Sequence, residues 1–365
     1  MEKVGDIYLL TNIERQYLGL IETERHWKLE KIMERCWVYY EEDNLRKIIE
    51  VIQEGENNTS YYERDLCVKT IENHTLAIGR KNQKVYKITP SYICSLDGSG
   101  VYFFCSNRFI CIGNFTSQKS FYTSLDEKIE SLEDINDWVT NWVKETTKND
   151  LAKLEIFKKE PRKHQKIKEG DFFRFQIGRR EYGYGRVLLN IVTLRKNKEL
   201  YEKLQGFHLL GTPLLIKTYK IITKNPDLTK EELRQLASFP SEYILDANLY
   251  YENYQIIGNI PLEEKEIDYP IQLITHKNEL FLQHGFHYKK IIEEDREKLE
   301  KLEKLKNLLK EDYSFRVAGF YIHELYNRKS MKDMIEKDYV IYDKRDLRNP
   351  DLKEIKETLW KYFEW

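Results

Sequence analysis

Hydrophobic and polar residues alternate most regularly near the middle of the chain. Residues 172–177 (FFRFQI) lead through a polar turn at 178–181 into residues 182–188 (YGYGRVL). Short aromatic and β-branched runs joined by turn formers predict a β-hairpin. Because side chains alternate between the two faces of a strand, Gly183 and Gly185 share one face and the tyrosines share the other. We expect the two glycines to allow close packing of the backbone.

The first third of the chain predicts several strands and one short helix. Residues 7–10 and 17–21 are apolar and aromatic runs on either side of a polar stretch, which predicts another hairpin. Residues 45–53 (LRKIIEVIQ) carry apolar side chains at a 3.6-residue spacing, which predicts an amphipathic helix. Further strands are predicted at 75–78, 85–88 and 101–104, which are rich in β-branched and aromatic residues.

Helix is predicted in four other segments, on different grounds. Residues 132–143 follow Ser131, a candidate N-cap, and have apolar side chains at intervals of three and four. A shorter helix or a turn is predicted at 229–238, behind capping residues. Residues 289–311 form a narrow leucine stripe among many charges, and residues 313–365 predict more helix.

A short signature occurs twice in the chain. Five residues recur at a constant offset of 165: Lys3, Gly5, Asp6, Arg15 and Tyr17 return as Lys168, Gly170, Asp171, Arg180 and Tyr182. The run Ile112, Gly113, Asn114 also returns as Ile257, Gly258, Asn259. In both halves the Gly-Asp pair comes first and Ile-Gly-Asn follows roughly 90 to 110 residues later, about one domain length. This order predicts a diverged tandem duplication.

These patterns predict an α+β protein. We expect two related β-rich domains with small, strongly bent, barrel-like sheets plus helices, followed by a helical C-terminal extension. The predicted boundaries are 1–150 for the diverged first copy, 151–167 for a linker, 168–288 for the second copy and 289–365 for the extension. The linker is inferred from residues 158–168, which contain a proline and many cations. The alternative for this basic stretch is contact with phosphate.

The repeated glycine and acidic positions have a structural interpretation. A carboxylate directly before an extended run can accept backbone N–H hydrogen bonds in a turn, although repetition of the position also permits a functional role. We expect the following residues to be structural: Gly5, Asp6, Gly113, Asn114, Gly170, Asp171, Gly183, Gly185, Gly258, Asn259 and Pro261.

Composition narrows the classes of partner. The 365 residues include 41% hydrophobic and 13% aromatic residues, which is too much apolar material for a disordered chain. With 60 Lys and Arg against 61 Asp and Glu, the net charge is -1, so bulk charge does not favour nucleic acid or anionic membranes. Neither a signal-peptide pattern nor a run of about 18 apolar residues is present, which predicts a cytoplasmic protein without a membrane partner.

The sequence offers weak candidates for chemistry. The five cysteines all lie in the first half without CxxC spacing, which predicts buried, reduced thiols. Cysteine–histidine catalysis requires a pair such as Cys36 with His26 or Cys94 with His74. The histidines at 276, 284 and 287 lack the HExxH spacing of a zinc site. We therefore expect no catalytic residue, no metal, no cofactor and no small-molecule substrate.

Protein binding is the remaining role, because aromatic side chains are common anchors at interfaces. The candidate partner-binding residues are Tyr182, Tyr184, Arg186, Tyr250, Tyr251 and Tyr254. Arg186 has two alternatives, an exposed contact for an acidic partner or a cation–π pair with Tyr184. Most of the tyrosines are expected at the core or its edge.

Three motifs together resemble the Imm26 family of bacterial immunity proteins, found beside polymorphic toxins. They are Lys168 with Gly170 to Phe173, the YGYGRVL run at 182–188, and IIGNIPLEE at 256–264. They cover about 100 residues, about one domain length. The first half keeps Gly-Asp and Ile-Gly-Asn but departs from the pattern elsewhere.

The resemblance implies a protein that binds and neutralises a cognate protein toxin by occlusion, without catalysis. The alternative is a nucleic-acid-binding or anti-phage defence adaptor, for which the near-zero net charge is unfavourable. A third class, an uncharacterised hydrolase, requires a pocket of convergent titratable groups that the sequence does not indicate.

Overall fold

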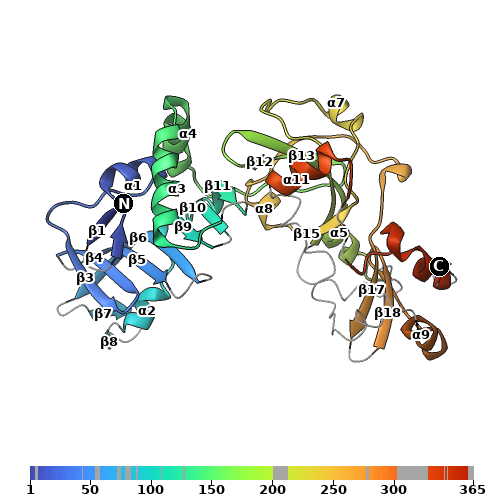
Figure 1. Ribbon diagram of the computed structural model, residues 1–365, viewed down its shortest axis with the longest axis horizontal. Helices are drawn as coiled ribbons and strands as arrows, with labels where there is room; N and C mark the ends of the chain where they lie inside the picture. The colour runs from blue at the N-terminus through green and yellow to red at the C-terminus, as the bar shows by residue number, and fades with distance from the viewer. Residues whose placement is uncertain are drawn as a thin grey trace. The chain divides into compact units, whose positions relative to one another are not determined.

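The computed structural model has two compact units, Met1–His164 and Gln165–Trp365 (Figure 1). The structure describes residues 1–4, 7–42, 44–53, 58–71, 75–78, 84–87, 89–107, 109–125, 128–199, 213–276, 279–301, 328–340, 342 and 344–360. The signature residues Gly5 and Asp6 lie outside these ranges, as do residues 302–327, which belong to the predicted helical segments at 289–311 and 313–365. The prediction of a mixed α+β protein is confirmed.

The first unit is built around an antiparallel sheet. Its main strands lie in the order β11-β10-β9-β6-β5-β4-β3. Their bounds are β3 Lys28–Met33, β4 Cys36–Glu41, β5 Asn44–Gln53, β6 Thr59–Ile71, β9 Ser99–Ser106, β10 Phe109–Asn114 and β11 Lys119–Ser124. β7 (Thr75–Ile78) pairs with β6 and β8 (Lys84–Lys87), while β1 (Glu2–Val4) pairs with β2 (Ile7–Leu9). The strands predicted at 75–78, 85–88 and 101–104 are therefore confirmed, within a residue or two at their ends.

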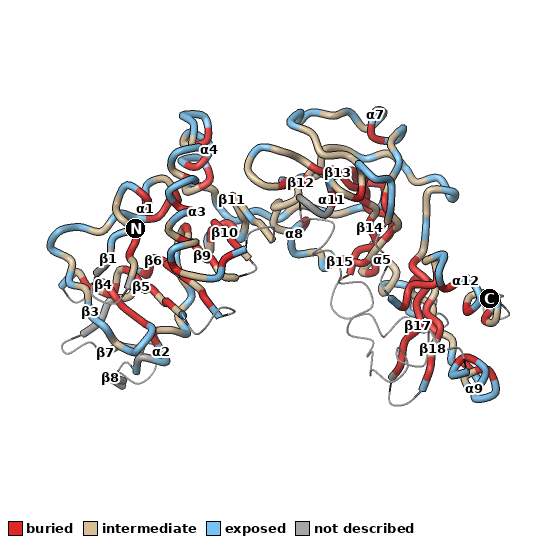
Figure 2. Tube along the Cα trace, viewed as in Figure 1, coloured by how far each residue is buried: buried red, intermediate tan, exposed pale blue. Residues whose placement is uncertain are grey.

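Helices cover both faces of this sheet. The helices are α1 (Asn12–Leu18), α2 (Pro90–Cys94), α3 (Leu132–Glu145) and α4 (Lys148–Lys158). Apolar residues of α1, α3 and α4 share one core cluster with Trp37 of β4 and Ile49 of β5. Their sequence neighbours Val38 and Ile48 point to the opposite face and pack against Ile93 of α2. Figure 2 shows the resulting concentration of buried residues along the strands.

The predicted helix at 132–143 is confirmed as α3, with Ser131 as its N-cap. Two other predictions in this unit are wrong. The predicted hairpin at 7–21 contains helix α1, because Thr11 and Glu14 form a capping box and Gly19 ends the helix with φ +80°. The predicted helix at 45–53 is strand β5. It is buried on both faces, so the alternation that distinguishes a strand is absent.

The second unit contains a five-stranded antiparallel sheet in the order β15-β14-β13-β12-β16. The bounds are β12 Asp171–Ile177, β13 Glu181–Asn190, β14 Pro213–Thr218, β15 Glu242–Leu245 and β16 Gln255–Asn259. The helical segments beside it are α5 Ile191–Lys196, α7 Lys230–Arg234, α8 Ala247–Tyr250, η2 Glu264–Glu266 and α11 Arg328–Glu336. The predicted hairpin at 172–188 is confirmed as β12 and β13, and the helix predicted at 229–238 is shorter, with a capping box between Thr229 and Glu232.

A three-stranded sheet follows, formed by β17 (Ile271–His276), β18 (Glu279–His284) and β19 (His287–Lys290). It packs against α9 (Glu293–Glu300), η3 (Pro350–Leu352) and α12 (Lys353–Thr358), and their apolar residues form one cluster. The core of the five-stranded sheet also includes Met331 and Met334 of α11. The C-terminal helical segments thus share cores with both sheets of their unit.

The expected barrel-like, strongly bent sheets are not found. Within the described ranges every sheet is open, and the main sheets end in β3 and β11 in the first unit and in β15 and β16 in the second. The physical reason is that separate elements bury both faces of each sheet, so neither sheet needs to close on itself to exclude water.

The strand orders of the two units differ. Strand β10, with Gly113 and Asn114, lies between β9 and β11, whereas β16, with Gly258 and Asn259, is an edge strand beside β12. The two sheets thus give no common strand order for the repeated Ile-Gly-Asn motif, and the tandem duplication stays a prediction. No helix in the described part of the chain has the length and apolar character needed to cross a membrane.

Candidate functional site

The β12–β13 hairpin is the scaffold of the predicted binding segment. Gly185 lies opposite Phe173 and Gly183 lies opposite Phe175. A Cβ atom at Gly185 would lie 2.3 Å from the Phe173 ring, and one at Gly183 would lie 2.4 Å from the Phe175 ring. The glycines therefore leave room for the two rings to lie across the neighbouring strand, as close backbone packing predicts.

Arg186 is completely buried on the other face of this hairpin, with 0% of the residue exposed. Its guanidinium pairs with the carboxylate of Glu266 and donates hydrogen bonds to the carbonyl oxygens of Ile260, at 2.8 Å, and Pro261, at 3.3 Å. It also lies over the ring of Phe172, 4.5 Å from the centroid. Arg186 thus fixes the segment that follows β16 onto the sheet.

Two of the predicted partner-binding residues are consequently not surface anchors. Arg186 is not an exposed contact, and its aromatic neighbour is Phe172 instead of the predicted Tyr184. Tyr184 is also fully buried, and its hydroxyl donates to the carbonyl oxygen of Asn225 at 2.8 Å. The burial of both side chains follows from the alternation of side chains along a strand, because Tyr184 and Arg186 are two residues apart and point to the same, covered face.

The Gly-Asp and Ile-Gly-Asn motifs meet at the start of the sheet. Asp171 accepts hydrogen bonds from the backbone N–H of Lys168, at 2.6 Å, and from the side-chain amide of Asn259, at 2.7 Å. Gly170 has φ +85°, and a Cβ there would lie 2.2 Å from the carbonyl oxygen of Ile260. These contacts fit the turn interpretation of Asp171 and leave its carboxylate engaged within the fold.

The corresponding motif of the first unit has a related local role. The Asn114 amide donates to the carbonyl oxygen of Phe157 at 3.0 Å, and its carbonyl accepts from the N–H of Thr116 at 2.8 Å. A Cβ at Gly113 would lie 2.4 Å from the Tyr102 ring. In both units the asparagine ends a strand and holds the chain beside it.

The most accessible of the predicted anchors lies in α8, close to the end of β15. Leu245 and Tyr250 are 46% and 38% exposed. Tyr251 is half-buried and contacts Tyr250 edge to face, with centroids 5.1 Å apart. The backbone of this segment is held by Gln165, whose N–H donates to the carbonyl oxygen of Tyr250 at 3.0 Å. We call Leu245, Tyr250 and Tyr251 the α8 patch.

The other two predicted anchors are half-buried. Tyr254 packs on Phe173 and Phe175, with centroid distances of 5.9 and 5.5 Å. Tyr182 lies beneath the guanidinium of Arg174, 5.2 Å from it. Both contribute to packing at the edge of the core, whereas Tyr250 is exposed.

Sequence reasoning missed a buried ionic cluster in the first unit. Glu63 lies between Arg15, 2.7 Å away, and Lys47, 3.0 Å away, and Lys47 also pairs with Asp65. Burial favours a raised pKa for Glu63, but the charges of Arg15 and Lys47 outweigh it and lower the pKa to about 2. Burial raises the pKa of Asp65 despite Lys47. The available signal was the charged triplet Glu63 to Asp65 inside a strand pattern.

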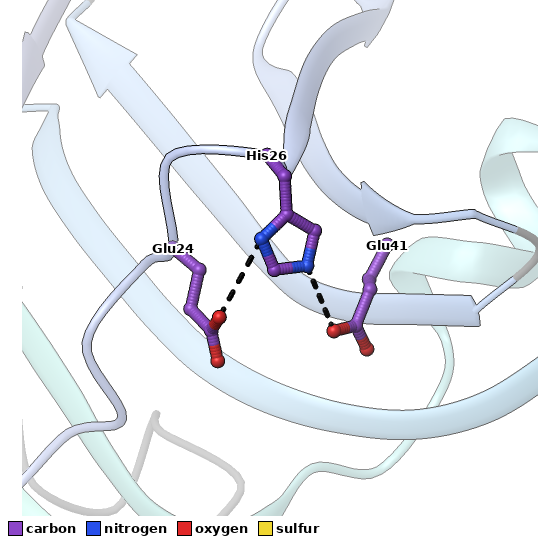
Figure 3. A group of neighbouring side chains, drawn as sticks. All are labelled: Glu24, His26 and Glu41. Atoms are coloured by element: carbon purple, nitrogen blue, oxygen red, sulfur yellow. Dashed lines mark hydrogen bonds and ion pairs between the residues drawn. The ribbon is translucent and has the colours of Figure 1, made fainter.

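A histidine and two carboxylates meet on the surface of the first unit (Figure 3). His26 Nδ1 lies 3.5 Å from Glu24, and His26 Nε2 lies 3.0 Å from Glu41. The two ring nitrogens thus face different carboxylates, and Glu41 is also paired with Arg46. In this arrangement each ring nitrogen contacts one carboxylate, so the three side chains form a bridge of polar contacts on the surface.

The candidate Cys36–His26 pair is not found among the described contacts, and His26 contacts Glu24 and Glu41 instead. Cys36 lies beside Cys94, while the side chains of His74 and His276 are outside the described residues. His287 stacks on Phe286, and His284 contacts Tyr269 edge to face. Burial lowers the pKa of both histidines. Their aromatic contacts are those of packing residues.

Residues 168–278 match the family model of Imm26, immunity protein 26. The match contains the five-stranded sheet and all three motifs of the predicted resemblance, so that prediction is confirmed for this segment. The family's name suggests a role in toxin immunity, which suggests a non-catalytic protein. No curated protein and no solved structure matches the chain.

Proposed function

We propose that this protein is an immunity protein that binds a cognate protein toxin and blocks it by occlusion, without chemistry of its own. The observation that carries the proposal is the Imm26 match over residues 168–278. We further propose that this second copy provides the principal binding surface, that the unit before it is a diverged copy, and that binding takes place in the cytoplasm.

The packing of the matched segment supports recognition by a preformed surface. Its glycine–phenylalanine pairs and the Arg186–Glu266 pair fix the sheet and the segment after β16. The α8 patch presents apolar and aromatic area on this rigid frame. Aromatic anchors of this kind lose little conformational entropy on binding, which favours a tight protein complex.

The experiment is to express the chain with the toxin encoded next to it in the native genome. We expect restored growth and a one-to-one complex that co-purifies through size-exclusion chromatography. A toxin that neither binds the purified chain nor loses activity in its presence contradicts the proposal. Affinity for nucleic acid that falls steeply with salt, without toxin binding, would support the adaptor alternative.

A further inference from the structure

Two cysteines from distant parts of the first unit lie in contact. The Sγ atoms of Cys36, the first residue of β4, and Cys94, the last residue of α2, are 3.2 Å apart. Both side chains belong to the cluster between the sheet and α2. A disulfide has a sulfur–sulfur distance of about 2.05 Å, so closing the bond requires the atoms to approach by about 1 Å.

The backbone around the pair is fixed by one arginine. Arg64 donates to the carbonyl oxygens of Cys94, at 2.7 Å, and Leu96, at 3.2 Å. It also pairs with Glu50 at 2.5 Å, and Glu50 lies opposite Cys36 in the β4–β5 register. Arg64 therefore joins the helix end that carries Cys94 to β5, the strand that pairs with β4 beside Cys36, which keeps the two sulfur atoms near each other.

We propose that Cys36 and Cys94 form a redox pair that closes to an intramolecular disulfide when the protein meets a peroxide. Cys94 is half-buried, whereas Cys36 is 1% exposed, so the peroxide reaches Cys94 first. Burial and the neighbouring Cys94 thiol raise the pKa of Cys36, which keeps it protonated until its partner is oxidised.

The chemistry balances with hydrogen peroxide as the two-electron oxidant. The Cys94 sulfur attacks one peroxide oxygen, the O–O bond breaks, and Cys94 becomes a sulfenic acid with release of water. The Cys36 sulfur then attacks the Cys94 sulfur and displaces hydroxide, which takes the Cys36 proton and leaves as a second water. Two thiols and one peroxide thus give one disulfide and two waters.

The test treats the native full-length chain with hydrogen peroxide, removes the peroxide, unfolds the chain in denaturant so that all remaining thiols react with N-ethylmaleimide, and measures intact mass and linked peptides. The chain has five cysteines. We expect alkylated thiols to fall from five to three, with one peptide pair joining Cys36 to Cys94 and full recovery of five after dithiothreitol. Cys36→Ser and Cys94→Ser should each abolish the linked pair.

Cys67 provides the matched control because it is exposed to peroxide but is not part of the proposed pair. Cys67→Ser should retain the Cys36–Cys94 bond, with alkylated thiols falling from four to two. Cys36→Ala is a second variant in case the serine at this buried position prevents folding, and it should also lack the bond. Five alkylated thiols after treatment, a bond made by Cys67, or sulfinic acid at Cys94 without a cross-link would each overturn the proposal.

Discussion

The guanidinium of Arg186 and the carboxylate of Glu266 form an ion pair between residues 80 positions apart in the chain. Arg186 is fully buried, and 12% of the Glu266 side chain is exposed. The same guanidinium binds two carbonyl oxygens of the segment after β16. One central strand residue therefore determines the position of a conspicuous sequence motif, IGNIPLEE.

Replacement of Arg186 by methionine should destabilise the second unit strongly. Met fills much of the apolar volume, but Glu266 and the two carbonyl oxygens lose their donor. Removing one member of a buried pair costs about 3–5 kcal/mol, which should appear as a lower midpoint in urea denaturation followed by circular dichroism. The control is Arg234→Met, because the Arg234–Glu263 pair is more exposed and exposed ion pairs contribute little to stability. Equal effects of the two substitutions would refute a special role for Arg186.

Gly185→Ala should destabilise the hairpin through one identified collision. The added methyl group would lie 2.3 Å from the Phe173 ring and 2.8 Å from the Lys217 carbonyl oxygen. Overpacking of this kind costs about 1–3 kcal/mol. In a double-mutant cycle with Phe173→Leu, which relieves the ring contact, the combined loss of unfolding free energy should be smaller than the sum. Simple additivity would show that the ring is not the cause.

The sequence predicts elements well where one face of the element meets solvent or where its ends carry local signals. The β12–β13 hairpin was predictable from its turn and its glycine–aromatic alternation, and α3 from its apolar spacing and Ser131. The Thr11 to Glu14 capping box was also present in the sequence and indicates α1, but the apolar runs beside it favoured a hairpin.

Long-range burial was not predictable in the same way. Strand β5 is covered on both faces, and Lys47 is buried there through Glu63 and Asp65 on β6. Its hydrophobic pattern therefore resembles that of a helix. Likewise, the sequence allows Arg186 to be a surface anchor, and only the fold shows that Glu266 lies beside it. At the candidate site, sequence alone located the segment, whereas burial distinguished Tyr250 from Tyr184.

Glu63 should make the first unit acid-sensitive. Its pKa is lowered to about 2 in the folded protein from an ordinary 4.5, so its stabilising contribution is present above 4.5 and is lost as pH falls toward 2. Glu63→Gln should lower the thermal midpoint at pH 7, because the buried positive charges of Arg15 and Lys47 lose the carboxylate that neutralises them. Its stability should also vary less than that of the wild type below pH 4.5. Both proteins retain Asp65, so the difference between their pH profiles reports on Glu63; parallel profiles would contradict the assignment.

Glu242 should have the opposite pH dependence. Among the described residues its buried Oε1 has no hydrogen-bond partner, and burial raises its pKa to about 8, partly countered by Arg348. Because the folded pKa exceeds the ordinary 4.5, this contribution to stability is present at low pH and is lost as pH rises through 8. Glu242→Gln should therefore raise the thermal midpoint at pH 9 and change it much less at pH 4. The exposed Glu264→Gln is the control, and a matching shift there would contradict a burial effect.

Tyr250 should contribute directly to toxin binding if the α8 patch is the binding surface of the proposed immunity protein. The side chain is partly exposed and contacts Tyr251, so truncation removes apolar contact area with little loss of core packing. Tyr250→Ala should weaken the complex at least tenfold, or about 1.4 kcal/mol, in a calorimetric titration with toxin. Its thermal midpoint should stay close to that of the wild type.

Trp360→Ala is the matched comparison, because Trp360 is 61% exposed and lies outside the segment that matches Imm26. Its removal should leave toxin affinity unchanged. If Trp360→Ala weakens the complex and Tyr250→Ala does not, the toxin binds the C-terminal helical segments instead, and the immunity proposal stands with a different surface. If the wild-type chain itself shows no affinity for the toxin, the proposed function fails. The pair of variants thus separates an error in the binding surface from an error in the function.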